Sequence, residues 1–260
     1  RVPRMALTAT ANPMVRMDIV QNLNLVGGQQ FINSFNRPNI EYRIQYKDNP
    51  LRQLKSFLKD HKNQSGIIYC ATRKSVEKIY SNILQDGFEV DYYHAGLDTN
   101  QRNLAQSRFQ KSDHSIMVAT VAFGMGIDKP DVRFVFHYDM PANLSAYYQE
   151  TGRAGRDGQA SVAHMIYGLQ DVMTRKMLIN TSTAPTKILQ ARKSQLREML
   201  SFCETTSCRR KTLLEHFGES TDTSCGNCDS CLNPAAMQDG TLAAKQFISC
   251  TIRVIQSRNL

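Results

Sequence analysis

Two short motifs that ATP-hydrolysing enzymes of the P-loop class need are missing from this sequence. None of its fourteen glycines is followed by lysine, so the phosphate-cradling loop Gly-Lys-Ser/Thr is absent. No aspartate is followed by glutamate, so the acidic pair that holds magnesium and orients water is absent as well. These 260 residues therefore do not contain a complete site of that class.

Signals for membrane insertion and secretion are also lacking. No apolar run reaches the roughly 18 residues that a membrane-spanning helix needs, and no signal peptide is recognisable, so no membrane partner is predicted. Seven cysteines without a secretory signal indicate a reducing compartment, with metal or thiol roles rather than disulfides. The chain opens with Arg1-Val2-Pro3 instead of methionine, from which we expect a piece of a longer protein.

Positive charge and a sufficient apolar fraction are what the sequence does have. The formal net charge is +9 and the pI is about 9.3, which favours a polyanionic partner because cations gain affinity for phosphate through counterion release. Hydrophobic residues make up 41%, enough for a core, and the length allows one large domain or two smaller ones.

The apolar pattern predicts alternating strands and helices. Continuous apolar runs at 66–70 and 116–119 are typical of strands buried on both faces of a parallel sheet. Further strands are predicted at 5–11, 41–45, 89–93, 132–137 and 161–167. Segments with apolar residues three and four positions apart lie between most of them. Such repeated units predict an α/β fold, a parallel sheet flanked by helices, whose ligands bind beyond the carboxyl ends of the strands.

The chain changes character after Tyr167, where strand patterns stop and helical spacing takes over. Leu196, Met199 and Cys203 fall on one helical face. We therefore place a domain boundary near Gly168 and expect a small helical subdomain after it.

The most specific motif is the turn at 149–158, which reads Gln-Glu-Thr-Gly-Arg-Ala-Gly-Arg-Asp-Gly. Glycine lets the backbone approach a ligand closely, and arginine presents a planar fork of donors that fits phosphate oxygens. The turn is suited to aim Arg153 and Arg156 at the terminal phosphates of a nucleotide, where they would stabilise charge during phosphoryl transfer. Two isolated arginines would more often form a solvated basic loop, but the complete spacing Gln-x-x-Gly-Arg-x-Gly-Arg is far more specific.

Four stretches resemble conserved motifs of the RecQ family of DNA helicases, and they occur in the family's order. Residues 7–11 (LTATA) are similar to motif three and 67–73 to motif four. Residues 118–130 are similar to motif five and 147–158 to motif six. The resemblance covers nearly the whole chain, and it implies a RecA-like sheet followed by a zinc-binding subdomain.

The resemblance also implies roles at individual positions. Arg156 would be the arginine finger that faces the γ-phosphate of ATP, with Arg153 supporting it and Gln149 helping to sense the nucleotide. Gly126 and Asp128 would lie near the ribose and the phosphates.

The resemblance also implies which residues contact DNA. Thr72, Arg73 and Thr120 would touch the DNA backbone, because hydroxyl groups and backbone amides suit phosphate contacts that do not depend on sequence. His94 also lies in a stretch that matches the family, and a structural role is as well supported for it as a functional one.

Three cysteines within seven residues, Cys225, Cys228 and Cys231, predict a metal site. An iron–sulfur cluster is the rival to zinc, but the ferredoxin pattern needs a further cysteine four residues on, where this chain has Ala235. Zinc is therefore favoured. Four thiolates around one tetrahedral zinc leave no open position for water, so the site is predicted to be structural.

The fourth zinc ligand has three candidates. Cys203 continues an apolar helical stripe and fits a buried core position, so Cys208 is the better choice, and His216 is a weaker alternative. The resemblance agrees, because RecQ proteins supply their first ligand from a Cys-Arg-Arg segment like residues 208–210.

The resemblance divides the chain into four parts. Residues 1–36 would be the end of a first RecA-like domain and a linker, and 37–168 the second RecA-like domain. Residues 169–234 would form the zinc-binding subdomain, and 235–260 the start of a truncated winged-helix domain. The first RecA-like domain, which carries the missing ATP motifs in the family, would precede Arg1 as a partner in cis.

The hypothesis is a fragment of an ATP-dependent 3′→5′ DNA helicase that acts in repair and recombination on single-stranded DNA and duplex junctions. It would hold structural zinc, it would use ATP and magnesium only within the intact enzyme, and by itself it would be inactive. It would work in the cytoplasm and nucleoid of a bacterium or in a eukaryotic nucleus. The alternatives are a non-catalytic DNA-binding or scaffolding module with a helicase fold, and an RNA helicase of the same superfamily, which the cysteine cluster disfavours.

Overall fold

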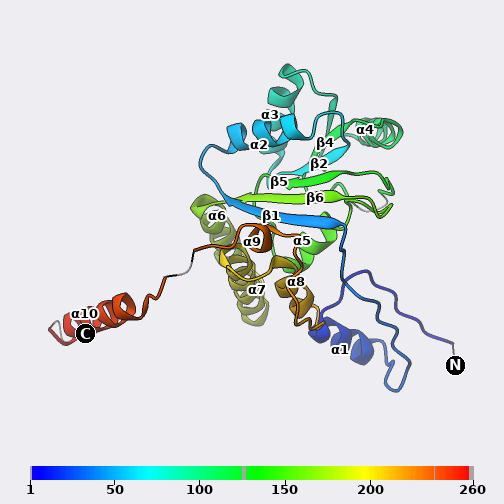
Figure 1. The fold of residues 1–260 in the computed structure, drawn as a ribbon. Coiled ribbons are helices and arrows are strands. Elements are labelled where there is room, and N and C mark those ends of the chain that lie inside the picture. Colours follow the sequence, from blue (N-terminus) through cyan, green and yellow to red (C-terminus); the bar gives the residue numbers. More distant parts are fainter. Residues whose placement is uncertain (1, 125–126, 237, 258–260) are drawn as a thin grey trace.

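The computed structural model describes residues 2–124, 127–236 and 238–257, and its centre is one six-stranded sheet (Figure 1). The strand order is β1-β6-β5-β2-β4-β3, and every neighbouring pair is parallel. The strands are β1 (Ile40–Tyr46), β2 (Gly66–Tyr69), β3 (Val90–Tyr93), β4 (Ile116–Ala119), β5 (Phe134–His137) and β6 (Ser161–Tyr167). The predicted α/β class with a parallel sheet is confirmed.

Helices follow or precede the strands and continue beyond the sheet. Those within the sheet region are α2 (Pro50–Asp60), α3 (Arg73–Gln85), α4 (Thr99–Lys111) and α5 (Leu144–Thr151). The others are α1 (Pro13–Asn22), α6 (Leu169–Asn180), α7 (Thr186–Glu204), α8 (Arg209–His216), α9 (Asp229–Leu232) and α10 (Thr241–Ser257). No helix in the described part of the chain is long and apolar enough to cross a bilayer.

Both faces of the sheet are covered, which is why the central strands are continuous apolar runs. Helices α2 and α3 cover one face, with Leu58 and Ile79 inside its core. Helices α4, α5 and α7 contribute Phe109, Tyr147 and Phe202 to the core on the other face. Figure 1 shows α2 and α3 near β2 and β4 in the upper part of the molecule, and α5 and α7 below β1.

The helical region after β6 packs into the same core as the sheet. Leu196, Met199 and Leu213 belong to the hydrophobic cluster that also contains Ile40 and Val135 of the sheet. Helix α6 follows β6 directly, with Gly168 as its N-cap residue. The predicted boundary near Gly168 therefore separates two kinds of secondary structure that share one continuous interior.

The strand predicted at 5–11 does not form. The described residues before α1 have no strand partner, and Met5 and Leu7 are exposed. A strand needs a neighbour to pair its backbone groups and cover its side chains, and none of the described strands lies beside this segment. The segment has the apolar composition of a strand but lacks the pairing that would make it one.

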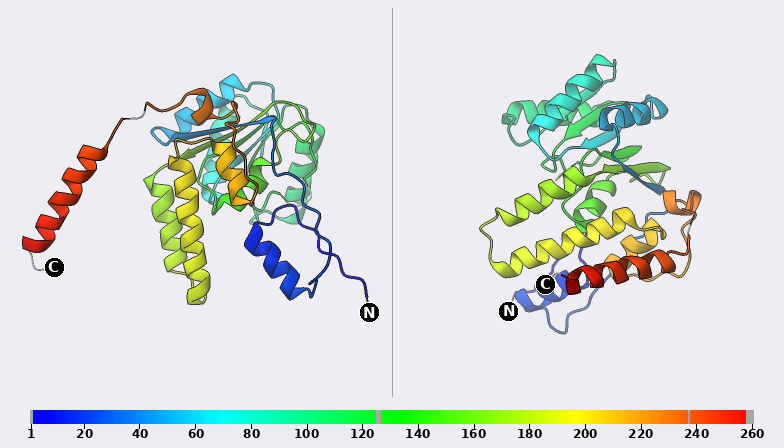
Figure 2. Two further views of the ribbon diagram at one scale, coloured as in Figure 1. Left: turned by 60° about the horizontal axis from the view of Figure 1, so that its bottom comes forward. Right: turned by 90° about the vertical axis from the view of Figure 1, so that its left-hand side faces the viewer.

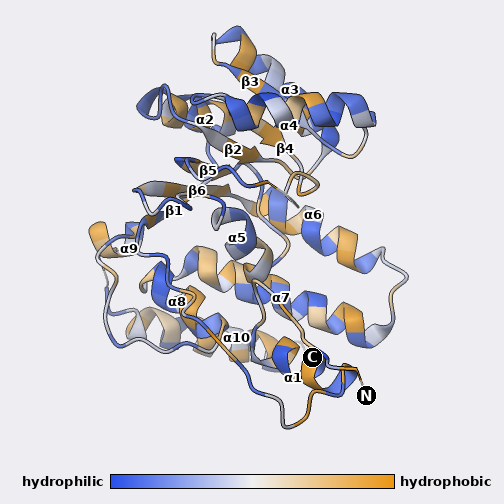
Figure 3. Ribbon diagram, turned by 90° about the vertical axis from the view of Figure 1, so that its right-hand side faces the viewer, coloured by the Kyte–Doolittle hydropathy of each residue, from blue (hydrophilic) through white to orange (hydrophobic). Residues whose placement is uncertain are grey.

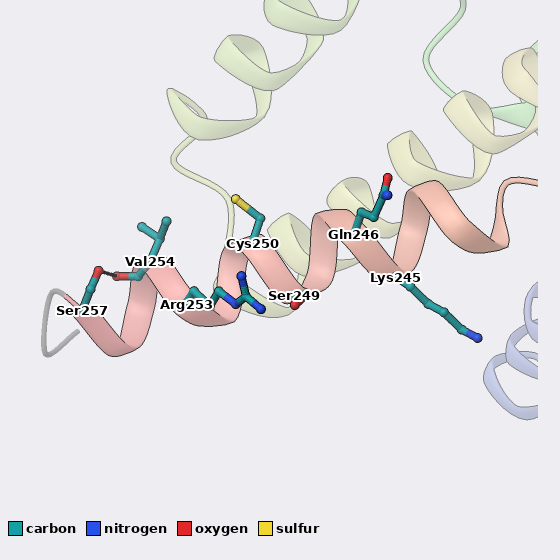
Figure 4. Close-up of a pocket in the computed structure, with 7 residues that line it drawn as sticks. All are labelled: Lys245, Gln246, Ser249, Cys250, Arg253, Val254 and Ser257. Carbon is teal, nitrogen blue, oxygen red and sulfur yellow. Dashed lines mark hydrogen bonds between the residues drawn. The ribbon is translucent and has the colours of Figure 1, made fainter.

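Helix α10 stands away from the rest of the molecule (Figure 2). None of its described residues is buried, and apolar side chains such as Phe247, Ile248 and Ile252 are exposed. Hydrophobic and hydrophilic residues alternate along it (Figure 3). A hollow beside Lys245, Cys250 and Arg253 belongs to this one helix (Figure 4), so it takes no part in the sites described below.

A buried histidine in the sheet makes stability depend on pH. His164 of β6 is 5% exposed, and its ring stacks on Phe136 and contacts Phe57. Its Nδ1 has no hydrogen-bond partner among the described residues. Burial, with smaller contributions from the nearby Arg43 and His61, lowers the pKa of His164 from its ordinary 6.5 to about 4, against the opposing effect of Asp229.

We expect His164 to destabilise the fold as the pH falls. Between pH 6.5 and 4 the unfolded chain binds a proton at His164 that the folded state does not. The free energy of unfolding that depends on neutral His164 is therefore fully present above pH 6.5 and is lost towards pH 4. Urea unfolding should show that the wild type loses about 1 kcal/mol more between about pH 7.5 and 5.5 than the His164→Phe variant. His114→Phe, at an exposed histidine, is the control. Equal pH dependence of His164→Phe and wild type would contradict the prediction.

Candidate functional site

The turn that carries the two arginines begins where α5 ends. Asn143 caps the start of α5 by accepting a hydrogen bond from the Ala146 N–H at 2.8 Å, and Gly152 is its C-cap residue. Inside the helix, Glu150 points into the core, where its Oε2 lies 2.7 Å from Nε2 of the buried His137. These contacts fix the direction in which the chain enters the turn.

The turn lies at the amino ends of β5 and β6, not at the carboxyl edge that the fold class suggested. The Gly155 N–H donates to the carbonyl of Val132 at 2.8 Å, just before β5 begins. Because all strands are parallel, the loop from the end of β4 to the start of β5 must cross the sheet, and buried Phe123 and Ile127 hold it on the α5 face. The arginine turn meets that crossing loop.

Gly155 is required by the backbone and by close contacts. Its φ is +55°, and a Cβ there would lie 2.5 Å from Asn39 Nδ2 and 2.6 Å from Ser161 Oγ. Asn39 Nδ2 in turn donates to the carbonyls of Gly155 and Gln159 at 2.8 and 2.9 Å. The glycine therefore allows the chain to reverse tightly against the start of β6.

Arg153 is held by the crossing loop. Its Nη1 donates to the carbonyl of Gly124 at 2.5 Å, and a Cβ on Gly124 would lie 2.4 Å from Arg153 Nη2. The Tyr69 hydroxyl donates to the adjacent Phe123 carbonyl at 3.0 Å. Burial raises the pKa of Tyr69, so this hydroxyl stays protonated.

Arg156 is placed differently, with its guanidinium at the surface. Its Nη1 donates to the Ile127 carbonyl at 2.8 Å and to Asp128 Oδ1 at 3.0 Å. The side chain of Arg156 is 36% exposed and that of Asp128 is 88% exposed. The structure thus brings together Arg156 and Asp128, two residues that the resemblance assigned to the nucleotide site, whereas Gly126 lies outside the described residues.

Gln149 connects the turn to the N-terminal segment. Its side-chain amide donates a hydrogen bond to the hydroxyl of Thr10, which lies 139 positions earlier in the chain. Two of the stretches that resemble family motifs, 7–11 and 147–158, are therefore in direct contact.

The predicted nucleic-acid residues lie at the carboxyl ends of the neighbouring strands β2 and β4. Thr72 is the N-cap of α3, where its hydroxyl accepts from the Ser75 N–H at 3.1 Å, and Arg73 follows it on the surface. Thr120 directly follows β4 and is half-buried. Arg73 covers Gly96, since a Cβ on that glycine would lie 2.9 Å from Arg73 Nη1. His94 is buried, and its Nδ1 accepts from the Gly96 N–H.

Four cysteines meet beside the edge strand β1. The sulfur atoms of Cys208, Cys225, Cys228 and Cys231 all lie within 4.8 Å of one another. Tetrahedral zinc with bonds of about 2.3 Å would place its sulfur ligands about 3.8 Å apart, and the sulfurs of Cys225 and Cys231 are 3.9 Å apart. The donor set and its spacing fit structural zinc.

The chemistry of Cys208 and Cys203 differs in the way the sequence suggested. Burial acts to raise the pKa of Cys208, but hydrogen bonds to its sulfur from the N–H groups of Lys211 and Cys225 and from the thiols of Cys225 and Cys231 together lower the pKa to about 7. Cys203 is in the core instead, where burial raises its pKa to about 12. His216 lies outside the cysteine cluster and contacts Ser145.

A partly buried ion pair joins the cysteine cluster to the sheet. Arg209 donates through Nε to Asp229 Oδ1 at 3.0 Å, and Asp229 Oδ2 accepts from the N–H of Ile44 in β1 at 2.8 Å. Tyr42 of β1 also forms an isolated backbone bridge with Cys228. The free edge of β1 is therefore covered by the metal-site loop, which protects it from pairing with another chain.

Sequence reasoning missed the residues that position these sites. Arg37 and Asn39 received no role from the sequence, although their side chains bind carbonyls of the arginine turn. Asp229 and Tyr69 were not singled out for any such role. A loop of side chains rich in hydrogen-bonding groups, Asn-Arg-Pro-Asn at 36–39, was the one available signal.

Comparisons with known proteins now bear on these sites. Residues 49–158 match the family described as "Helicase conserved C-terminal domain", and residues 169–232 match "RecQ zinc-binding". "ATP-dependent DNA helicase RecQ" of Pasteurella multocida is 43% identical over 255 residues, which cover 98% of this chain and 40% of that protein. "ATP-dependent helicase SGS1" of Saccharomyces cerevisiae is 39% identical over 257 residues, 95% of this chain and 18% of that protein.

Solved structures show the same fold. The structure of S. cerevisiae Dbp5 bound to RNA and ADP BeF3 has a TM-score of 0.54 and 21% identity to this chain. The match covers 73% of this chain and 54% of that one. The chain therefore shares the fold of that structure over the matched part. It spans about two fifths of the length of the bacterial proteins that it resembles.

We expect Cys228→Ser to release the metal and disorder the region around it. Removing one of four thiolates lowers zinc affinity steeply, and the cluster's contacts to β1 depend on the metal-bound loop. Elemental analysis should show a loss of about one zinc per chain, and circular dichroism should show reduced helicity. Cys250→Ser, at an exposed cysteine on α10, is the matched control. Full zinc content with unchanged helicity in Cys228→Ser would contradict the assignment.

Proposed function

The chain belongs to the RecQ family of helicases, and we propose that it is part of an ATP-dependent 3′→5′ DNA helicase that unwinds DNA in repair and recombination. Within that enzyme it supplies the arginine finger and the zinc-binding region. Residues 37–168 act as the second RecA-like domain, 169–234 as the zinc-binding subdomain and 235–260 as the start of a winged-helix domain. Residues 1–36 join this assembly to a first RecA-like domain in cis.

The observation that carries the proposal is the different placement of the two arginines. Arg156 has an exposed guanidinium whose carboxylate partner, Asp128, is almost fully exposed. An exposed ion pair of this kind contributes only about 1 kcal/mol or less, so a phosphate oxygen can replace the carboxylate at little cost. Arg153 is fastened to the Gly124 carbonyl and supports the turn. Arg156 is therefore the finger that stabilises charge on the γ-phosphate.

ATP and magnesium would bind between this chain and the first RecA-like domain. That domain would supply the phosphate loop and the acidic pair that these 260 residues lack. Gln149 would sense the nucleotide, and its bond to Thr10 gives it a contact with the segment that leads to the other domain. Gly126 and Asp128 would lie near the ribose and phosphates.

DNA would bind at a second surface, beyond the carboxyl ends of β2 and β4. Thr72, Arg73 and Thr120 lie there, and the exposed start of α3 adds backbone N–H groups that favour phosphate. The net charge of +9 supports a DNA partner, as single strands and at duplex junctions. The protein would act where DNA is kept, which is the cytoplasm and nucleoid of a bacterium or a eukaryotic nucleus.

We expect Arg156→Ala in the intact protein to lower the turnover number of DNA-stimulated ATP hydrolysis by about a thousandfold, because an arginine finger stabilises charge that develops only in the transition state. DNA affinity should stay within about twofold, since Arg156 contacts Ile127 and Asp128 rather than Thr72 or Thr120. Steady-state ATPase and fluorescence-anisotropy assays measure the two effects.

The control for that experiment is Arg108→Ala, another exposed arginine paired with a carboxylate, Asp91. Turnover should be preserved in the control. Wild-type turnover in Arg156→Ala would refute the assignment of the finger.

By itself, the 260-residue chain should not hydrolyse ATP in the presence of DNA, because it lacks the phosphate loop and the acidic pair. A phosphate-release assay with purified chain and single-stranded DNA tests this, and the intact protein is the positive control. Clear turnover by the pure chain would mean that a phosphate-binding element lies within these residues, and the proposed division of the ATP site would be wrong. It would also leave the alternative of a non-catalytic module without support.

A further inference from the structure

We propose that Arg37 is the positioning residue of the arginine turn and that the zinc-binding region fixes Arg37 through Phe35 and Glu219. The inference deepens the proposed function and rests on it, since the turn is taken to carry the arginine finger. In this role the segment 34–39 before β1, called the connector here, transmits the position of the metal-bound region to Arg153 and Arg156.

Arg37 gathers three carbonyl groups of the turn with one guanidinium. Its Nη1 donates to the Gly152 carbonyl at 3.1 Å, and its Nη2 donates to the carbonyls of Ala154 and Gly155, each at 2.9 Å. The carbonyls of Gly152 and Ala154 lie on either side of Arg153, and that of Gly155 directly precedes Arg156. A planar fork can hold three acceptors in fixed directions, which a lysine ammonium on a flexible stem cannot do.

The connector that carries Arg37 is itself clamped two residues earlier. The ring of Phe35 stacks on Phe217 with centroids 4.6 Å apart and planes at 13°. The carbonyl of Phe35 accepts a hydrogen bond from the Tyr148 hydroxyl of α5 at 2.8 Å. The Phe35 backbone is therefore fixed between α5 and the end of α8.

A carboxylate completes the clamp. Glu219 Oε2 accepts from the Phe35 N–H at 2.8 Å, and Glu219 Oε1 accepts from the Ser34 hydroxyl at 2.6 Å. Hydrogen bonds to a charged acceptor are roughly twice as strong as neutral ones. The Glu219 N–H donates to the Leu214 carbonyl, which ties the carboxylate to the end of α8.

Helix α8 connects this clamp to the metal site. Cys208 lies at its N-cap position, and Phe217 is its C-cap residue, so one helix of eight residues has a metal ligand at one end and the connector clamp at the other. Such a helix is about 12 Å long and rigid at this length. Movement of the cysteine cluster relative to the sheet is therefore transmitted to Phe35 and from there to Arg37.

The experiment compares Arg37→Lys, Glu219→Ala and the double variant in the intact protein. Loss of the fork should lower kcat for DNA-stimulated ATP hydrolysis by about 10- to 100-fold, because a finger displaced by about 1 Å loses that much. KM for ATP and Kd for single-stranded DNA should change less than about twofold. Arg43→Lys, at an arginine paired locally with Glu41 on β1, should have wild-type kcat.

Two further measurements separate positioning from misfolding. Zinc content and the thermal midpoint of Arg37→Lys should equal those of the wild type. Exchange of backbone amide hydrogens in the variant should become faster within residues 149–158. The effects of Arg37→Lys and Glu219→Ala on kcat should be less than multiplicative in the double variant, because both act through the same turn. Multiplicative effects would overturn the link to the zinc-binding region.

Arg156→Ala, measured in parallel, distinguishes failure of this inference from failure of the proposed function. If Arg156→Ala loses turnover while Arg37→Lys keeps its kcat, Arg37 does not position the finger and the inference is wrong. If Arg156→Ala keeps its turnover, the finger assignment in the proposed function fails. Unchanged hydrogen exchange at 149–158 in Arg37→Lys would overturn the positioning role independently of activity.

Discussion

The carboxylate of Asp229 is the point at which the metal-site region and the sheet are joined. It accepts hydrogen bonds from Arg209 and from the backbone of Ile44 in the edge strand β1. Arg209 also donates to the carbonyls of Phe202 and Cys203 at the end of α7. Either charge without the other would lower the stability of the fold, because both groups are partly buried. Here each is neutralised by the other and also hydrogen-bonds to backbone groups. As a result, the four cysteines, the edge strand β1 and helices α7 and α8 are held in one arrangement.

From this joint, a chain of contacts leads to the arginine turn. Helix α8 runs from Cys208 to the aromatic and carboxylate clamp around Phe35, and the connector then delivers Arg37 to the carbonyls of the turn. The turn and the cysteine cluster are far apart in the sequence, yet one short helix and four connector residues link them. This chain of contacts is the route by which we propose that the cysteine cluster influences the arginine turn without contacting it.

The arginine turn also shows how one motif places two arginines in different surroundings. Arg153 and Arg156 are three residues apart and have the same charge, and each donates to a backbone carbonyl of the crossing loop, that of Gly124 and that of Ile127. Arg156 also pairs with the exposed carboxylate of Asp128. An exposed carboxylate can be exchanged for another anion, which is why we propose Arg156 as the finger and Arg153 as its support.

Much of this protein could be predicted from the sequence, because its determinants are local. The runs at 66–69 and 116–119 are apolar at every position or nearly so, which only a strand covered on both faces accommodates, and they form β2 and β4 as expected. The spacing of Cys225, Cys228 and Cys231 was sufficient to predict a metal site, and an apolar stripe was sufficient to place Cys203 in the core. Such patterns depend on neighbours within a few residues.

Only the tertiary structure decided which distant residues meet. Residues 5–11 have an apolar pattern but no neighbouring strand to pair with, so they do not form the expected strand. Arg37, Glu219 and Asp229 each bind groups more than one hundred positions away, and a charged residue in a loop has the same local pattern whether it binds a carbonyl or water. The sequence by itself determined the elements and the metal-binding spacing, because these follow from periodicity and short-range chemistry. The structure decided how the arginine turn is held, because that depends on hydrogen bonds between segments that only folding brings together.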